Sequence, residues 1–334
     1  MLAIPVAGIL AAAPAPAADD YYKGKLVTAY VGYAPGGSND IVTRAVAQFI
    51  GKHMGGTPNT ITKSMPGAVT RTLASYLYTQ APKDGTEFGN IDRQIMMAAL
   101  LDPTIKEPFD MRQFTWLGSP LQETLTCVSW HTSPIQSIQD LQTKEFVVAS
   151  PGANSGESIT EALMNKLMGT KIKLIHGYAG GAEMNLAMQR GEVHGRCGIG
   201  WESAKACCSD FLKNGQMKVI IQLATTKNPE LSGVPSLADV RMPDADRQAL
   251  GLIYASQQFG RPFAAPPGMP TDRKAALKKA FADTMKDPEF AAHMATQKFN
   301  LNPLSGEDID RILTAAYTAP KAVLDRAIEL GKAN

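Results

Sequence analysis

The sequence predicts an α/β protein with two domains, each built on a mostly parallel sheet. Strand and helix patterns alternate from Leu26 to about Leu223, which is typical of parallel strands joined by crossover helices. The chain has 334 residues, more than one domain of ordinary size. Because 44% of its residues are hydrophobic, each domain can have its own core.

The predicted elements follow one another with glycine, proline or polar residues between them. Strands are expected at 26–33, 59–63, 88–91, 125–130, 145–149, 172–176, 193–199 and 217–224. Helices are expected at 39–54, 69–80, 156–168, 181–190, 201–213, 271–286, 288–298 and 305–330.

Two interruptions indicate where the chain crosses between domains. The alternation breaks near 101–118, at Asp102-Pro103 and Glu107-Pro108, and the apolar run 217–224 is the candidate return. Domain 1 is therefore expected to contain residues 22–118 and 222–285. Domain 2 is expected to contain residues 119–221 and 286–334.

The N-terminus predicts export. Residues 2–13 are apolar and residues 14–18 are small, as in the core and cleavage region of a signal peptide, although no Lys or Arg precedes Lys23. We therefore expect residues 1–18 to be removed. The mature chain has no other segment apolar enough to span a membrane, so we expect it to be soluble.

The four cysteines lack the spacing of a metal site, and we expect no metal. Cys127 and Cys197 lie in strand-like segments of the middle third, so we predict a disulfide between them. Cys207 and Cys208 are adjacent and would close a strained ring, so free thiols are expected there. The net charge of +2, with no basic stripe, argues against a nucleic-acid partner.

Three glycine-rich corners connect a predicted strand to a helix. They are Tyr33-Ala34-Pro35-Gly36-Gly37-Ser38-Asn39-Asp40, Ser150-Pro151-Gly152-Ala153-Asn154-Ser155-Gly156-Glu157 and Tyr178-Ala179-Gly180-Gly181-Ala182-Glu183. Any one of them can be an ordinary connection. Three in two halves of the chain favour a cleft lined by backbone N–H groups that binds an anion. Nucleotide motifs are missing, which favours a small carboxylate and no cofactor.

The predicted ligand-binding residues come from these corners and from the end of the strand at 88–91. Arg93, after that strand, either binds a second carboxylate, or pairs with the neighbouring Asp92, or lies at a solvated helix start. The set is Tyr33, Pro35, Gly36, Gly37, Ser38, Asn39, Asp40, Arg93, Ser150, Gly152, Ala153, Asn154, Ser155, Tyr178, Gly180 and Gly181.

The order of these motifs resembles that of the substrate-binding proteins of tripartite tricarboxylate transporters, the Bug-type periplasmic receptors. Beside the three corners, the segments that carry the resemblance are Met65-Pro66-Gly67-Ala68, Ala81-Pro82-Lys83-Asp84-Gly85-Thr86, Gly191-Glu192-Val193-His194-Gly195 and Ala264-Ala265-Pro266-Pro267-Gly268-Met269-Pro270. Departures from the family pattern include Gly32-Tyr33, Val69-Thr70-Arg71, Lys83 and Arg93.

The resemblance implies a type II-like periplasmic binding protein with its ligand cleft between the two sheets. It implies a monomeric periplasmic receptor that captures a small organic carboxylate, delivers it to an integral-membrane transporter, and is not an enzyme. Two alternatives stay open: a ligand-sensing partner of a membrane kinase, and an exported hydrolase using Ser155 or Cys207. Ser155 lies in Gly-x-x-Ser-Gly, which is not a nucleophile elbow.

Overall fold

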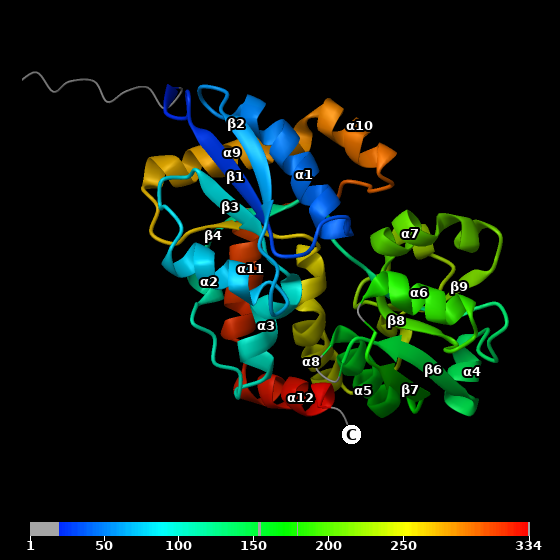
Figure 1. Ribbon diagram of the computed structural model, residues 1–334. Helices are drawn as coiled ribbons and strands as arrows, with labels where there is room; N and C mark the ends of the chain where they lie inside the picture. The colour runs from blue at the N-terminus through cyan, green and yellow to red at the C-terminus, as the bar shows by residue number, and fades with distance from the viewer. Residues whose placement is uncertain (1–19, 153–154, 179, 333–334) are drawn as a thin grey trace, which may run out of the picture.

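A six-stranded sheet organises the first lobe, which lies at the upper left in Figure 1. The computed structural model describes residues 20–152, 155–178 and 180–332, so the predicted signal peptide lies outside the described residues. The spatial order is β11–β4–β10–β3–β1–β2. The bounds are β1 Leu26–Val31, β2 Asn59–Ser64, β3 Glu87–Asn90, β4 Thr115–Ser119, β10 Phe263–Ala265 and β11 Leu304–Ser305.

The second lobe is built on a five-stranded sheet in the order β7–β6–β8–β5–β9. Its strands are β5 Leu125–Trp130, β6 Glu145–Ser150, β7 Lys171–His176, β8 Gly195–Gly200 and β9 Met217–Leu223. In each sheet three strands pair in parallel, β2–β1–β3 and β7–β6–β8, and the remaining strands are antiparallel. The predicted α/β class is confirmed.

Twelve helices are present in the described residues. They are α1 Ser38–Ile50, α2 Arg71–Thr79, α3 Arg93–Leu101, α4 Ile138–Thr143, α5 Gly156–Met168, α6 Gly181–Gln189, α7 Trp201–Lys213, α8 Asp244–Tyr254, α9 Thr271–Lys286, α10 Pro288–Thr296, α11 Gly306–Tyr317 and α12 Lys321–Gly331. The predicted helix 305–330 is divided in two because Pro320 cannot continue the helix that precedes it. None of the described helices is both long and apolar enough to cross a membrane.

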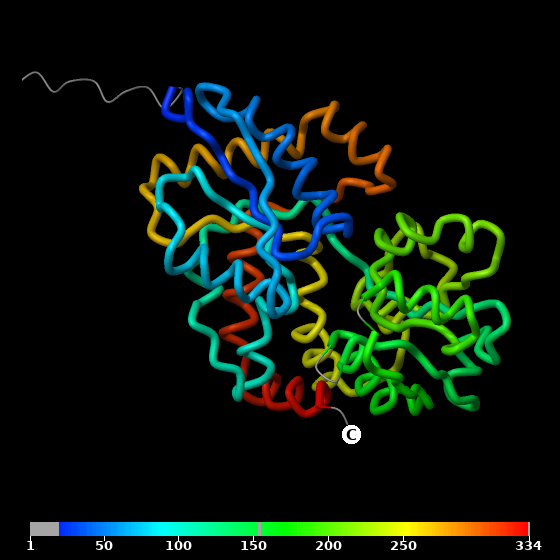
Figure 2. Tube along the Cα trace, viewed as in Figure 1, coloured from blue at the N-terminus to red at the C-terminus, as the bar shows by residue number. Residues whose placement is uncertain are grey.

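The helices cover both faces of both sheets. One face of the first sheet packs on α1, α9 and α10 around Phe88, Phe263 and Phe281. Its other face packs on α2, α3 and α11, and this core continues into the second lobe through α8 and α12. One face of the second sheet belongs to this shared core. Its other face packs on α6 and α7 around Met188 and Ile199. Apolar packing therefore connects the two lobes on the side of α12 (Figure 2).

The chain crosses between the sheets at 120–124, after β4, and again at 260–262, before β10. The two crossing segments touch: Gly260 has φ +48°, and a Cβ there would collide with the Leu121 carbonyl. The run proposed as the return crossing, 217–224, instead forms β9, which pairs with β5. Within the segment predicted for domain 2, β11 extends the first sheet by pairing with β4.

Two cysteine pairs are present. Cys127 on β5 and Cys197 on β8 are register partners on adjacent strands and form a disulfide. Cys207 and Cys208 are also joined, so the expectation of free thiols at these positions is wrong. The local reason is that Cys208 leaves the helical conformation (φ −134°, ψ 21°), which interrupts α7.

Candidate ligand-binding site

The first predicted loop joins β1 to the start of α1. Gly36 has φ +91°, whereas Gly37 has φ −83° and an ideal Cβ there would meet no atom within 4 Å. The positive φ that this turn needs is thus at Gly36. The buried Asp40 carboxylate accepts the Gly36 N–H at 2.9 Å and pairs with Arg44 at 2.9 Å. One N–H of the loop is therefore satisfied internally, while Pro35, Gly36 and Gly37 remain exposed.

The start of helix α3 lies beside this loop. The Tyr33 hydroxyl donates to Asp92 at 2.6 Å, and Asp92 caps α3 by accepting the Gln94 N–H at 2.7 Å. Burial, and then the Asp92 carboxylate, raise the pKa of Tyr33 above its ordinary value. Arg93 is the first residue of α3; its described hydrogen bond goes to the Gly260 carbonyl at 3.4 Å, and it forms no ion pair with Asp92.

The second predicted loop is held by serine hydroxyls. Ser150, at the end of β6, is fully buried, and its Oγ lies 2.9 Å from that of Ser155. Ser155 caps α5 by accepting the Ser158 N–H at 3.3 Å. The Gly152 N–H donates to the Ser150 hydroxyl at 3.3 Å. Ala153 and Asn154, also predicted here, lie outside the described residues.

The third loop lies directly beside the second. The Tyr178 N–H donates to the Ser150 carbonyl at 3.5 Å, and α6 begins at Gly181. Burial raises the pKa of Tyr178. Below both loops is Arg196 on β8, which is 6% exposed and donates to the Gly181 carbonyl at 3.3 Å.

Helix starts from the two lobes face each other. Gly156 is the first residue of α5. A Cβ at this position would lie 2.9 Å from the side-chain amide nitrogen (Nε2) of Gln94, at the start of α3. The structure therefore brings the second-lobe loop against the first-lobe residues near Arg93. Since the first N–H groups of a helix have no partner within it, this convergence places N–H donors of both helices between the lobes.

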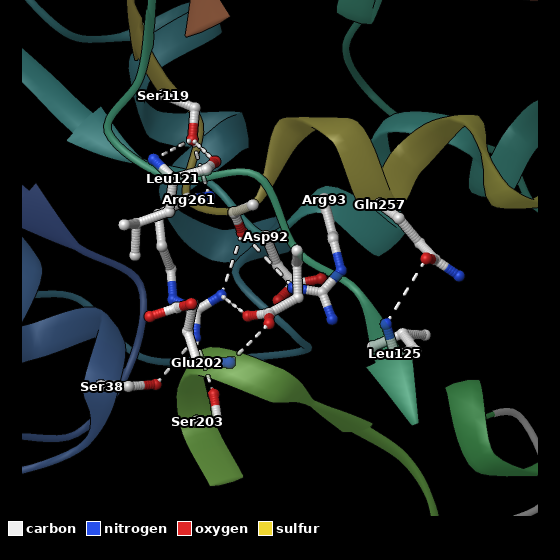
Figure 3. Close-up of polar contacts among 12 residues, drawn as sticks. Ser38, Asp92, Arg93, Ser119, Leu121, Leu125, Glu202, Ser203, Gln257 and Arg261 are labelled. Atoms are coloured by element: carbon white, nitrogen blue, oxygen red, sulfur yellow. Dashed lines mark hydrogen bonds and ion pairs between the residues drawn. The ribbon is translucent and has the colours of Figure 1, made fainter. Parts of the chain in front are cut away.

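Arg261, on the return crossing, connects the two lobes directly (Figure 3). It is 4% exposed, and its guanidinium donates to Ser38 Oγ of the first loop at 3.0 Å and to Ser203 Oγ of α7 at 3.1 Å. Its counter-ion is Glu123 on the outgoing crossing, at 3.4 Å. Burial lowers the pKa of Arg261, and Glu123 opposes that shift. The Nε atom has no hydrogen-bond partner among the described residues.

Glu157 adds a half-buried acid at the start of α5. Burial raises its pKa, and the nearby cations Arg196 and Arg93 partly oppose that shift. Both cations therefore act on a carboxyl group that belongs to the second loop. The arrangement offers guanidinium and backbone N–H donors to an anion. No cluster suited to a metal ion is found in the described ranges.

Three buried residues of this site were not predicted from the sequence, namely Glu123, Arg196 and Arg261. A usable signal was present for the arginines, because each follows a glycine and lies within or beside an apolar strand, where an unpaired charge is costly. Two cavities in the described part of the chain lie away from these residues, one beside Arg112 and Asp310 and one beside Ile138 and Arg241. The candidate site is therefore identified by hydrogen-bond donors that come together from both lobes, and not by an enclosed cavity.

The fold is that of known binding proteins. MatC from Rhodopseudomonas palustris, solved with bound malate, is 17% identical with a TM-score of 0.66, covering 92% of this chain and 98% of its own. Another R. palustris protein, solved with adipate, is 19% identical with a TM-score of 0.67, covering 90% and 97%. The periplasmic binding protein BugD is 16% identical with a TM-score of 0.63, covering 92% and 95%.

This chain has the Bug-type solute-binding protein fold. No protein-family model matches the sequence, and no curated protein matches it. At these identities the likeness establishes the fold, and the ligand must be inferred from the residues of the site.

Proposed function

We propose that this protein is a periplasmic receptor that captures a small organic carboxylate between its lobes and delivers it to a membrane transporter of the tripartite tricarboxylate type. One observation carries the proposal. In a fold shared with proteins solved with malate and adipate, the starts of α3 and α5 meet between the lobes beside the buried Arg261.

The chemistry suits an anion that is held without being changed. The free N–H groups at the starts of α1 and α5 can each donate to a carboxylate. Arg93 has one long hydrogen bond, to a backbone carbonyl, so its guanidinium is the most available cation of the site. A second carboxylate of the ligand would pair with Arg93, in keeping with a dicarboxylate.

The site supports binding better than catalysis. The described partners of the Ser155 hydroxyl are the hydroxyls of Ser150 and Ser158 and the carboxylate of Glu157, and they include no histidine such as a serine-hydrolase triad uses. The Cys207 sulfur is paired with Cys208 rather than available as a thiolate nucleophile. We therefore propose a non-enzymatic receptor that acts as a monomer in the periplasm.

A thermal-shift screen over organic acids tests the proposal. Ligand at a hundred times its Kd should stabilise the protein by about 2.7 kcal/mol, which corresponds to a rise in Tm of roughly 5 °C for a chain of this size. Mass spectrometry of the recovered acid should find it unchanged. Conversion of more than one equivalent per protein would contradict the receptor proposal, as would a panel with no stabilising acid.

A further inference from the structure

The paired cysteines of α7 are not explained by carboxylate binding. Cys207 is exposed at the surface, whereas Cys208 is 2% exposed. Helical conformation is interrupted at Cys208 and resumes beyond it, so the pair coincides with a kink in the helix. Ser203, in the first turn of the same helix, accepts a hydrogen bond from Arg261 at the candidate site.

Asn185 on α6 connects the cysteine pair to the candidate site. Its amide nitrogen donates to Cys208 Sγ at 3.2 Å and to Cys207 Sγ at 3.4 Å. Its amide oxygen accepts from Arg196 Nη1 at 2.6 Å. Both ends of one amide group are thus used, one by the sulfur atoms and the other by the cation beneath the second and third loops.

Apart from its hydrogen bond to the Asn185 amide oxygen, Arg196 is held only weakly. Nη1 makes its other hydrogen bond, with the Gly181 carbonyl, at 3.3 Å, and the buried Nε has no partner among the described residues. A guanidinium held mainly through one amide group will move when that amide group moves. Because Arg196 lies under Gly181 and close to Glu157, its movement changes the potential at the loops.

We propose that Cys207 and Cys208 form a thiol–disulfide exchange site whose redox state sets the position of Arg196 through Asn185. A thiolate of an external dithiol attacks the exposed Cys207 sulfur, the bond to Cys208 breaks, and Cys208 leaves as a thiolate that takes up a proton. The second thiol of the reductant then displaces Cys207. The reductant ends as a disulfide and the protein gains two electrons and two protons.

Reduction releases the constraint on α7. Once the sulfur atoms are separate, Cys208 can adopt helical dihedral angles, and adjacent side chains of a regular helix point about 100° apart. The two sulfur atoms then no longer lie together at the Asn185 nitrogen. Arg196 loses its fixed partner, and affinity for an anion falls.

Tryptophan fluorescence tests the conformational part without a ligand. Trp201 begins α7, and Trp130 contacts Phe211 beyond the kink with ring centroids 5.2 Å apart. We expect mild treatment with dithiothreitol to expose two alkylatable thiols, at Cys207 and Cys208, and to change the emission. The buried pair Cys127–Cys197 should stay intact. Alkylation at Cys207 and Cys208 with unchanged emission would overturn the proposal, and so would two unreactive cysteines.

Affinity for malate tests the link to the loops, and this arm alone rests on the proposed function. Reduction of the wild-type protein, or the substitution Cys207→Ser, should raise the Kd for malate by about fivefold or more. In Asn185→Ala the emission change should persist while the Kd becomes independent of redox state. Equal Kd values for the oxidised and reduced wild-type protein would refute the coupling. If malate binds neither form, the choice of ligand fails while the fluorescence result still decides the redox proposal.

Discussion

Replacing Arg261 by alanine should destabilise the protein more than any surface substitution. The guanidinium makes four polar contacts: to Ser38 at 3.0 Å, Ser203 at 3.1 Å, the Gly260 carbonyl at 3.1 Å and Glu123 at 3.4 Å. The contacts to Ser38 and Ser203 reach different lobes, so the substitution also removes a connection across the candidate site.

The magnitude follows from what is left behind. The Glu123 side chain is 1% exposed, so Arg261→Ala leaves a buried carboxylate without its counter-ion. Breaking a buried ion pair in this way costs about 3 to 5 kcal/mol. Native proteins are stable by about 5 to 15 kcal/mol in total, so a large part of the free energy of unfolding would be lost. Adding Glu123→Gln to Arg261→Ala should recover part of the loss because the unpaired charge is gone.

Urea unfolding followed by circular dichroism, without ligand, measures this effect. The matched control is Arg112→Ala, because the Arg112 side chain is 56% exposed where it pairs with Asp110. Exposed pairs contribute about 0 to 1 kcal/mol, so the control should change little. A loss at Arg261 as small as that of the control would refute the view that this arginine neutralises Glu123.

Three further predictions concern the candidate site. Gly37→Val should lose most of the affinity for the best acid, as measured by isothermal titration, while its circular dichroism spectrum stays native. The reason is that the valine side chain fits the free protein but covers the loop. Arg93→Gln should weaken malate binding about tenfold or more in the same assay, since a hydrogen bond to a charged group contributes roughly 1.5 to 3 kcal/mol. Glu157→Gln should gain stability relative to the wild-type protein as the pH rises from 4 to 7, measured by urea unfolding.

The sign of the Glu157 effect comes from its raised pKa in the folded state. Above the ordinary pKa of a glutamate, the native state binds more protons than the unfolded state, so wild-type stability falls with rising pH and Gln removes that fall. If the difference in free energy of unfolding between Glu157→Gln and the wild-type protein did not change with pH, this prediction would be contradicted.

Gly233→Val is the control for Gly37→Val, because Gly233 is an exposed glycine with open space around it, and this variant should bind the acid normally. Equal malate affinity in Arg93→Gln would remove Arg93 from the site.

Local patterns predicted most of the fold. The eight strands expected from apolar runs are present, because such runs carry enough β-forming residues to be recognised without their neighbours. Strands β4, β10 and β11 were not expected. Strand β11 has two residues and β10 has three, too few for a pattern; β11 pairs with β4, and β10 pairs with β3 and β4. The run 217–224 was expected as a strand and forms β9, but its local pattern could not show that this strand pairs with β5.

The candidate site also contains residues that local patterns predicted and residues that they did not. The glycine corners are local signals, and the sequence revealed them through turns and helix caps. The buried arginines depend on partners far along the chain: Arg261 meets Glu123 across 138 positions and Ser38 across 223. The glycine and the apolar strand beside Arg261 indicate that it is buried, but nothing near residue 261 identifies its partners, so only the fold reveals them.

A crystal structure with the most strongly stabilising acid tests the central claim most directly. We predict that the acid lies between the lobes, with a carboxylate within hydrogen-bond distance of backbone N–H groups of the loops at 36–40 and 152–156 and of the Arg93 guanidinium. An acid bound instead in the cavity beside Arg112 and Asp310, with the loops between the lobes unoccupied, would contradict it.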